Sequence, residues 1–219
     1  MKRRQWACWG VLVGTVWGSA CNSDGTQPPG PPADVVPSGG AGQGWYFNNP
    51  LPLPLSVTVV DLSGRPVSGV LVMWSVTSGD SSGAVNPLQS TTDANGIAST
   101  RDSVGSATIQ RVSATVTGVP GAANFTEVAT TPPTSAAVSL QNLAFNPDSV
   151  VVQSGGTVTW TWNDGAIGHN VTFTSGPARP PDSPTKASGT YALPLTTVGT
   201  YRYHCTIHQT MTGSVTVVH

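Results

Sequence analysis

The chain has 219 residues, a length typical of one or two domains, and only 9% of them are charged. Soluble proteins usually have about 25% charged residues, whereas this chain is rich in Val, Thr, Ser, Gly and Pro. Such a composition favours strands and turns over helices. The formal net charge is −1, from 9 basic and 10 acidic residues, so the chain lacks the basic surface that nucleic-acid binding requires.

The first twenty residues have the three parts of a secretory signal. Residues 2–4 are basic, residues 6–17 are largely apolar, and residues 18–20 are small. Since the apolar part is too short to span a bilayer stably, we predict that residues 1–20 are a cleaved signal peptide. Its loss removes three basic and no acidic residues, which takes the net charge from −1 to −4. The mature protein is therefore expected outside the cytoplasm.

Residues 18–21 resemble a bacterial lipobox, in which the cysteine becomes the lipid-modified first residue of the mature protein. The resemblance implies a lipid anchor on Cys21, and Asn22 in the next position implies the outer membrane. The protein would then lie in the periplasm or at the cell surface. Cleavage by the ordinary signal peptidase is the alternative, because Gly18 and Ala20 satisfy its preference for small residues.

The next two segments differ in apolar content. Residues 21–43 are rich in Gly, Pro, Ser and Gln and have almost no apolar side chain to bury, which predicts a disordered tether. Residues 44–130 alternate short apolar runs with turn residues at the spacing of a β-sandwich. We expect its strands at 55–61, 70–77, 96–102, 112–116 and 124–129.

Three segments of this first predicted domain carry a family resemblance. Residues 59–67, 72–76 and 91–98 resemble the bacterial Ig-like domains of the invasin and intimin type. The resemblance implies a spacer or an adhesive module outside the cytoplasm. Trp74 is expected in the core, because its neighbours alternate as in a half-buried strand.

A short Thr- and Pro-rich linker at 131–136 separates the two predicted domains. The second domain, 137–219, has about seven expected strands with Asn-Pro, Gly-Gly and Gly-Pro punctuation, which fits a Greek-key sandwich. These strands are expected at 138–145, 149–152, 157–162, 169–174, 189–193, 199–204 and 213–218. The sequence thus predicts an all-β protein with two β-sandwich domains.

A thiol, an imidazole and a thioether lie three residues apart near the C-terminus. Cys205, His208 and Met211 follow an expected strand, and a tight turn with this spacing lets all three side chains point toward one place. Together with a second imidazole they form the His2Cys set with a weak thioether that selects copper and transfers electrons. His169, upstream, is the candidate for that second imidazole.

The remaining cysteines and histidines fit such a site less well. Cys8 leaves with the signal peptide and Cys21 precedes the tether, so Cys205 is the single cysteine of the predicted domains. One thiol cannot form an internal disulfide, and a buried, inert cysteine is the alternative to a metal ligand. The alternation of strand 199–204 places His204 on the face opposite Cys205, and His219 is a weaker candidate still.

Two separated motifs of the second domain carry a second resemblance. His-Asn-Val at 169–171 and Tyr-His-Cys-Thr-Ile-His-Gln-Thr-Met at 203–211 resemble the cupredoxins, the blue-copper β-sandwich proteins that include plastocyanin. The short Cys-x2-His-x2-Met loop is most similar to that of amicyanin. The resemblance extends to residues 145–147 and 155–160, and so spans roughly 137–219.

The resemblance implies the roles of individual residues. His169, Cys205 and His208 would bind one copper ion, with Met211 as the long axial ligand. Asn170 would join the two ligand loops by hydrogen bonds. Ala166, Ile167 and Ile207 flank these positions, and we expect them to form an apolar rim where a redox partner docks.

The function implied is one-electron transfer between redox donor and acceptor proteins, with no substrate turnover and no small-molecule substrate. Zinc fits this ligand set less well, because zinc rarely binds a thioether. An oxidase or a nitrite reductase needs more copper ligands than a chain with 4 histidines offers. Two alternatives stay open, namely a protein for copper storage or handover and an adhesive surface protein whose copper module is structural.

Overall fold

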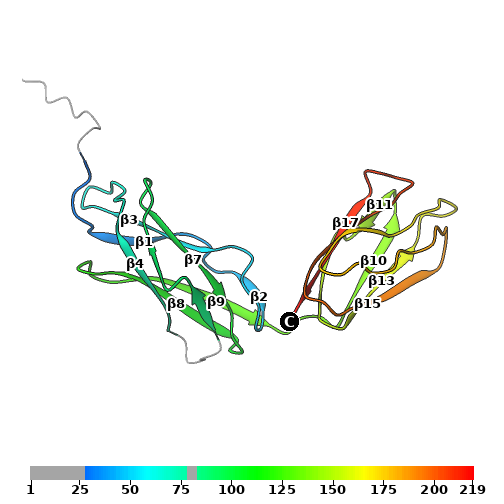
Figure 1. Cartoon of the computed structure of the whole chain (residues 1–219), viewed down its shortest axis with the longest axis horizontal. Coiled ribbons are helices and arrows are strands. Elements are labelled where there is room, and N and C mark those ends of the chain that lie inside the picture. The colour runs from blue at the N-terminus through cyan, green and yellow to red at the C-terminus, as the bar shows by residue number, and fades with distance from the viewer. Residues whose placement is uncertain (1–27, 78–82) are drawn as a thin grey trace, which may run out of the picture.

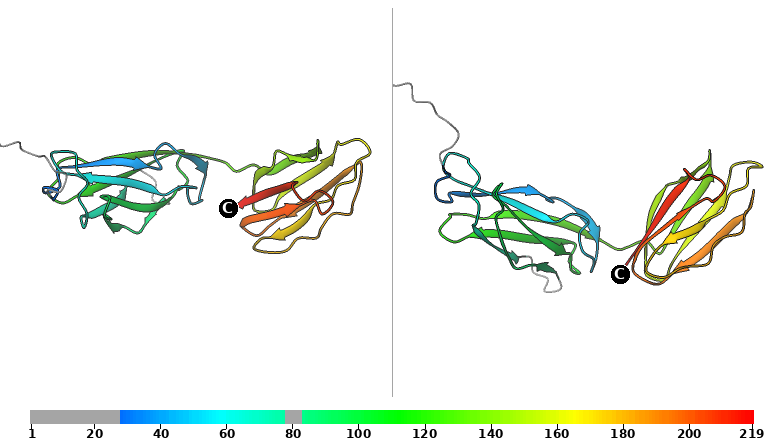
Figure 2. Two further views of the ribbon diagram at one scale, coloured as in Figure 1. Left: turned by 90° about the horizontal axis from the view of Figure 1, so that it is seen from above. Right: turned by 45° about the horizontal axis from the view of Figure 1, so that its top comes forward.

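The computed structural model describes residues 28–77 and 83–219, and all regular structure in them is β (Figure 1). The predicted all-β class is therefore confirmed. The predictions for the signal peptide, 1–20, and for lipidation of Cys21 lie outside the described residues. Within the described ranges no helix is long and apolar enough to cross a membrane. Figures 1 and 2 show two separate groups of strands joined by the chain between β9 and β10.

Two sheets form the first sandwich, and its Ig-like character stays a prediction. Their strand orders are β1-β3-β7-β5 and β2-β9-β8-β4-β6. The strands are β1 (Asp34–Gly39), β2 (Gly44–Tyr46), β3 (Leu55–Val60), β4 (Leu71–Val76), β5 (Ala84–Asn86), β6 (Gln89–Thr91), β7 (Ile97–Ser103), β8 (Ile109–Val116) and β9 (Ala123–Thr130). Alternation along the strands buries one face of each sheet, and Trp74 packs against Phe125 in the core with ring centroids 6.0 Å apart.

The predicted disordered tether, 21–43, is wrong in its second half. β1 pairs antiparallel with β3, and Val35 is buried in the core. Upstream of β1, the backbone N–H of Gly30 donates to the carboxylate of Asp61 over 2.8 Å. Composition misled the prediction because β1 is an edge strand, where Pro37 is tolerated without a backbone donor.

Two carboxyl groups are buried in the first sandwich, and one oxygen of each lacks a hydrogen-bond partner among the described residues. Asp102 accepts a hydrogen bond from Gln110 Nε2 at 2.6 Å, and Glu127 accepts one from the backbone N–H of Gln43. Within the described chain Asp102 Oδ2 and Glu127 Oε1 have no hydrogen-bond partner. Burial raises the pKa of Asp102 to about 6, and burial also raises the pKa of Glu127.

These raised pKa values predict a first sandwich that is more stable in mild acid. Between about pH 4 and about pH 6 the folded Asp102 binds a proton that the unfolded chain has lost, so the free energy of unfolding falls as pH rises through this window. We expect a gain on the order of 2 kcal/mol between about pH 7 and about pH 4, measured by urea unfolding with Trp fluorescence. Asp102→Asn should flatten this dependence, whereas Asp148→Asn in the second sandwich should not. Equal pH dependence in wild type and Asp102→Asn would contradict the assignment.

The second sandwich also has two sheets, in the orders β11-β10-β13-β15 and β12-β17-β16-β14. Its strands are β10 (Ser135–Gln141), β11 (Ala144–Asn146), β12 (Ser149–Gln153), β13 (Gly156–Trp162), β14 (Thr172–Ser175), β15 (Thr190–Leu195), β16 (Gly199–His204) and β17 (Thr212–Val218). Successive strands such as β12 and β13 lie in different sheets, so the chain crosses the core repeatedly. The first strand begins at Ser135, two positions before the predicted start of the domain.

Two strands of this domain differ in their bounds from those expected. The strand expected at 138–145 is interrupted by a turn, because Asn142 and Leu143 have φ angles of 53° and 56°. This conformation is unfavourable for leucine, and a pattern of apolar residues does not predict it. The strand expected at 169–174 begins only at Thr172, so His169 belongs to the loop before β14.

The core of the second sandwich is aromatic and lies beneath the ligand loops. Trp160 is fully buried and contacts Phe173, Tyr191 and Tyr203 with ring centroids 5.5 to 6.1 Å apart. Tyr203 points inward from β16, two residues before Cys205. At the other end of this sandwich, β17 leads to His219, whose backbone N–H donates to Asn49 Oδ1 of the first sandwich over 2.9 Å.

Candidate metal centre

Two loops at one end of the second sandwich carry the predicted ligands. The loop between β13 and β14 carries His169, and the loop between β16 and β17 carries Cys205, His208 and Met211. Backbone hydrogen bonds close the second loop, since Cys205 N–H donates to the Met211 carbonyl at 3.0 Å and Met211 N–H donates to that of His208 at 2.9 Å. The backbone itself therefore holds this loop in a tight turn.

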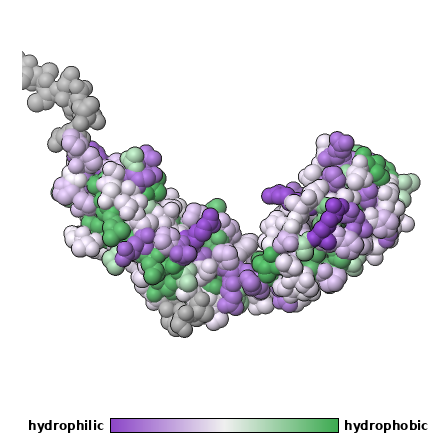
Figure 3. All heavy atoms as spheres, viewed as in Figure 1, coloured by the Kyte–Doolittle hydropathy of each residue, from purple (hydrophilic) through white to green (hydrophobic). Residues whose placement is uncertain are grey.

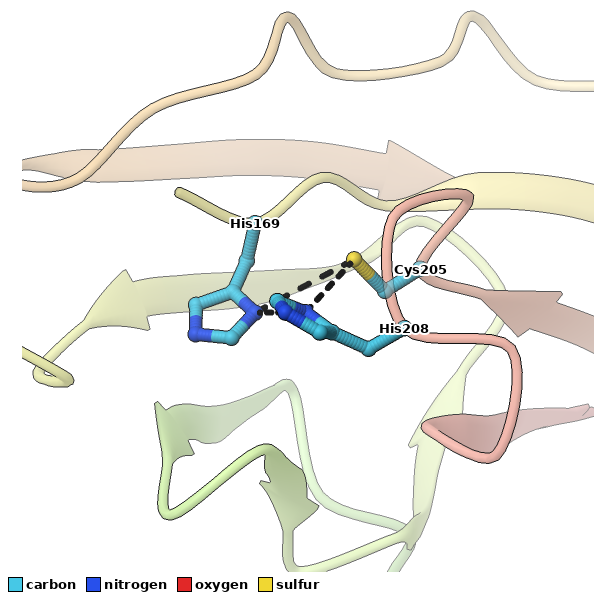
Figure 4. Close-up of side chains that lie close together, drawn as sticks. All are labelled: His169, Cys205 and His208. Atoms are coloured by element: carbon cyan, nitrogen blue, oxygen red, sulfur yellow. Dashed lines mark hydrogen bonds between the residues drawn. The ribbon is translucent and has the colours of Figure 1, made fainter. Parts of the chain in front are cut away.

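Three predicted ligands converge at one point, as Figure 4 shows. The Nδ1 atoms of His169 and His208 lie 3.1 Å apart, and Cys205 Sγ lies 3.9 Å and 3.7 Å from them, respectively. Nitrogen and sulfur ligands of a first-row metal ion bind at about 2.0 to 2.3 Å, and their donor atoms then lie roughly 3 to 4 Å apart. The three donor atoms are therefore spaced as the ligands of one ion are.

The two imidazoles differ in how far they are buried. Cys205 and His169 are fully buried, whereas His208 is half-buried. A buried thiol close to two imidazole nitrogens suits a metal that favours thiolate and imidazole ligands together, and copper is such a metal. The donor set therefore fits copper, with access to the site on the side of His208.

The side chain of Met211 is buried, and a backbone hydrogen bond fixes its position in the loop. Its side chain is only 2% exposed and packs with the apolar core of the second sandwich. The hydrogen bond from its N–H to the His208 carbonyl holds its backbone beside the other candidate ligands of the loop. The axial role expected of its thioether stays a prediction.

Asn170 joins the two ligand loops. Its Oδ1 accepts a hydrogen bond from the backbone N–H of Thr206 at 2.9 Å, and its Nδ2 donates to the Thr206 hydroxyl at 2.7 Å. Nδ2 also lies 3.2 Å from the Thr185 hydroxyl. Since Asn170 follows His169 and Thr206 follows Cys205, these bonds fix the distance between two of the candidate ligands.

We expect Asn170→Ala to lower copper affinity about 10-fold, the low end of the range for residues that orient metal ligands. The loss has a physical reason, because the two loops are then free to separate before the metal binds. Competition with a chelator of known affinity measures the change. Asn163→Ala is the control, since Asn163 is exposed and its side chain donates a hydrogen bond to Ser139 Oγ, away from the ligand loops. An unchanged affinity in Asn170→Ala would contradict this role.

Sequence reasoning missed one contact of the site. Asp164 Oδ2 lies 2.9 Å from His169 Nε2, the ring nitrogen that faces away from Cys205. The same carboxylate accepts hydrogen bonds from the backbone N–H groups of Asn142 and Leu143 at 3.0 Å each. An aspartate five residues before the histidine was the only signal in the sequence, and it belongs to no motif that we identified.

The other two histidines lie apart from this cluster. His204 is half-buried between Thr172 and Thr212 of the neighbouring strands, and it lines a shallow surface pocket of about 510 Å³ together with Arg202 and Asp148. His219 is exposed at the opposite end of the sandwich. Within the described ranges the group of His, Cys and acidic side chains able to hold a metal ion consists of His169, Cys205 and His208.

Known proteins match the second sandwich. Residues 133–218 match the family described as copper binding proteins, plastocyanin/azurin family. Amicyanin of Paracoccus denitrificans is 37% identical over 83 residues, which cover 36% of this chain and 63% of amicyanin. Plastocyanin of Scenedesmus fuscus is 35% identical over 86 residues, which cover 34% of this chain and 87% of plastocyanin.

Solved structures of similar proteins cover the same part of the chain. A purple cupredoxin from Nitrosopumilus maritimus is 24% identical, with a TM-score of 0.34 and coverage of 38% of this chain and 99% of that one. A Cu(I) form of an amicyanin variant is 34% identical, with a TM-score of 0.35 and coverage of 38% and 82%. Through its second sandwich, the chain belongs to the plastocyanin/azurin family of copper-binding proteins, the cupredoxins, whose cofactor is one copper ion.

Proposed function

We propose that the second sandwich is a one-electron carrier that binds copper through His169, Cys205, His208 and Met211. The observation that supports this most directly is the convergence of two imidazole nitrogens and one thiol within 4.8 Å of one another on loops already restrained by hydrogen bonds. Bound copper supplies the Cu(I)/Cu(II) couple. The chain supplies fixed donor atoms, so that little has to move when the charge of the site changes.

The restraints on these donor atoms come from three directions. Asn170 ties one ligand loop to the other, the backbone closes the loop from Cys205 to Met211, and the aromatic core packs beneath both. A site so restrained exchanges electrons quickly, because reorganisation of the ligands is a large part of the barrier. A copper-handover protein, by contrast, needs ligands that open.

We propose that electrons enter and leave on the side of the half-buried His208. Ile207 and Ile167 are 51% and 44% exposed, and Leu143, which the sequence did not suggest, is 46% exposed. The backbone N–H groups of Leu143 and Ile167 bond to the carboxylate and the carbonyl of Asp164, respectively, which places both residues beside the site. Figure 3 shows apolar residues at the end of the second sandwich that lies at the top of the view, where β17 begins. Such an apolar surface suits brief docking of redox proteins as donor and acceptor.

The rest of the chain supports a role outside the cytoplasm. We propose that residues 1–20 direct export, that Cys21 carries a lipid anchor in the outer membrane, and that the first sandwich is an Ig-like spacer. Since β1 (Asp34–Gly39) belongs to that sandwich, any tether after Cys21 ends before residue 34 instead of at residue 43. The spacer then accounts for more of the distance between the membrane and the copper domain.

A redox cycle of the purified full chain tests the proposed function. After addition of Cu(II) we expect an intense absorption band near ~600 nm and a narrow copper hyperfine splitting, both typical of type 1 copper. Ascorbate should bleach the band and ferricyanide should restore it over repeated cycles without loss of copper. Colourless protein with ordinary tetragonal copper signals would contradict electron transfer. Loss of copper in each cycle would instead favour storage or handover.

A further inference from the structure

His169 is held from behind by a carboxylate. Its Nε2 lies 2.9 Å from Asp164 Oδ2, while its Nδ1 faces Cys205 and His208. The side chain of His169 is fully buried and that of Asp164 is 13% exposed, so water competes little for this contact. A carboxylate accepts but does not donate, and the hydrogen bond therefore requires the proton of the imidazole to be on Nε2. The Nδ1 lone pair is then directed at the other donor atoms.

Asp164 is itself fixed by a turn from another part of the chain. The N–H groups of Asn142 and Leu143 donate one bond each to its two carboxylate oxygens. Both residues have positive φ angles, in a turn whose two successive N–H groups point to this one carboxylate. This conformation is unfavourable for a leucine, and the bond from its N–H to the carboxylate stabilises it.

The charge of Asp164 is favoured in the folded protein. Its two oxygens accept hydrogen bonds from the backbone N–H groups of Asn142 and Leu143, and the ring of His169 lies at 2.9 Å, so three groups surround the carboxylate. A negative charge therefore lies one imidazole ring away from the proposed copper. Within the described chain His208 has no carboxylate partner on its ring, so the two imidazole ligands differ in their surroundings.

We propose that Asp164 is a positioning residue for electron transfer, which sets the tautomer of His169 and favours Cu(II) over Cu(I). The inference rests on the proposed function and adds a determinant of the reduction potential to it. A carboxylate behind a histidine ligand makes the imidazole a stronger donor, and its negative charge attracts the more positive oxidation state. Both effects lower the reduction potential.

Asp164→Asn tests the proposal, because it keeps the size of the side chain and removes its charge. We expect the variant to stay blue and reversible. The ratio of its Cu(II) affinity to its Cu(I) affinity should fall about 10-fold, and the reduction potential should rise accordingly. Direct voltammetry measures the potential. Asp148→Asn, an exposed carboxylate of the same sandwich, is the matched control and should leave the potential unchanged.

The possible outcomes separate this inference from the proposed function. A wild-type protein that is not blue and reversible overturns the function itself. A reversible wild type with the same potential in Asp164→Asn overturns only the role of Asp164. If the variant does not fold, NMR of the ¹⁵N-labelled wild type with Cu(I) decides instead, since we expect a slowly exchanging proton on His169 Nε2. A proton on Nδ1, or rapid exchange at Nε2, overturns the proposal.

Discussion

Replacing Cys205 by serine is expected to abolish the intense visible band of the copper-loaded protein. The band arises from the bond between copper and thiolate, and a serine hydroxyl is neither ionised at neutral pH nor a soft ligand. The change removes one of three converging donor atoms from a fully buried position, so we expect Cu(II) affinity to fall by more than about 100-fold. Absorption spectra and chelator competition measure the two effects.

His204→Ala is the matched control for this experiment. His204 is the neighbour of Cys205 in the chain, but it lies on the outer face of β16 between Thr172 and Thr212. We expect the blue band and the copper affinity to survive its loss. A band that persists in Cys205→Ser, or that disappears in His204→Ala, would mean that the wrong residue has been assigned as the ligand.

Trp160→Ala is expected to lower the free energy of unfolding of the second sandwich by about 3 to 5 kcal/mol. Trp160 has no exposed surface and packs against the rings of Phe173, Tyr191 and Tyr203. The expected loss comes from the cavity that the ring leaves and from its lost burial. Urea unfolding of the apoprotein, followed by circular dichroism, measures the effect.

Trp74→Ala in the first sandwich provides the comparison. Trp74 is 3% exposed and packs in a separate core, so its loss should destabilise the first sandwich alone. The copper spectrum and the unfolding of the second sandwich should stay as in wild type. If Trp74→Ala weakens copper binding as much as Trp160→Ala does, the two cores do not act independently.

The sequence alone predicted that His169, Cys205 and His208 converge, because local spacing encodes much of this arrangement. Cys205, His208 and Met211 belong to one short loop after a strand with clear alternation, and the motif around His169 is contiguous. The contact of Asp164 with Leu143 was not predictable in the same way. It requires two consecutive residues with positive φ, one of them a leucine, and the approach of two loops more than twenty residues apart.

The first strand of the fold was missed for a related reason. Composition measures how much a segment can bury by itself, and residues 21–43 can bury little. Edge pairing needs only backbone groups and one or two apolar side chains, which β1 supplies with Val35. Polar, Pro-containing segments next to a sandwich are therefore poorly judged by composition alone.

The ends of β17 have a consequence for how the protein is attached to a surface. β17 starts beside Met211 at the metal centre and ends at the side of the sandwich where the chain arrives from β9 (Figure 1). Any attachment through the N-terminal part of the chain thus enters the second sandwich at the end opposite the ligands. If the protein were immobilised on an electrode through that part of the chain, the proposed copper site would face the solution. Electron exchange with the electrode would then require a soluble mediator.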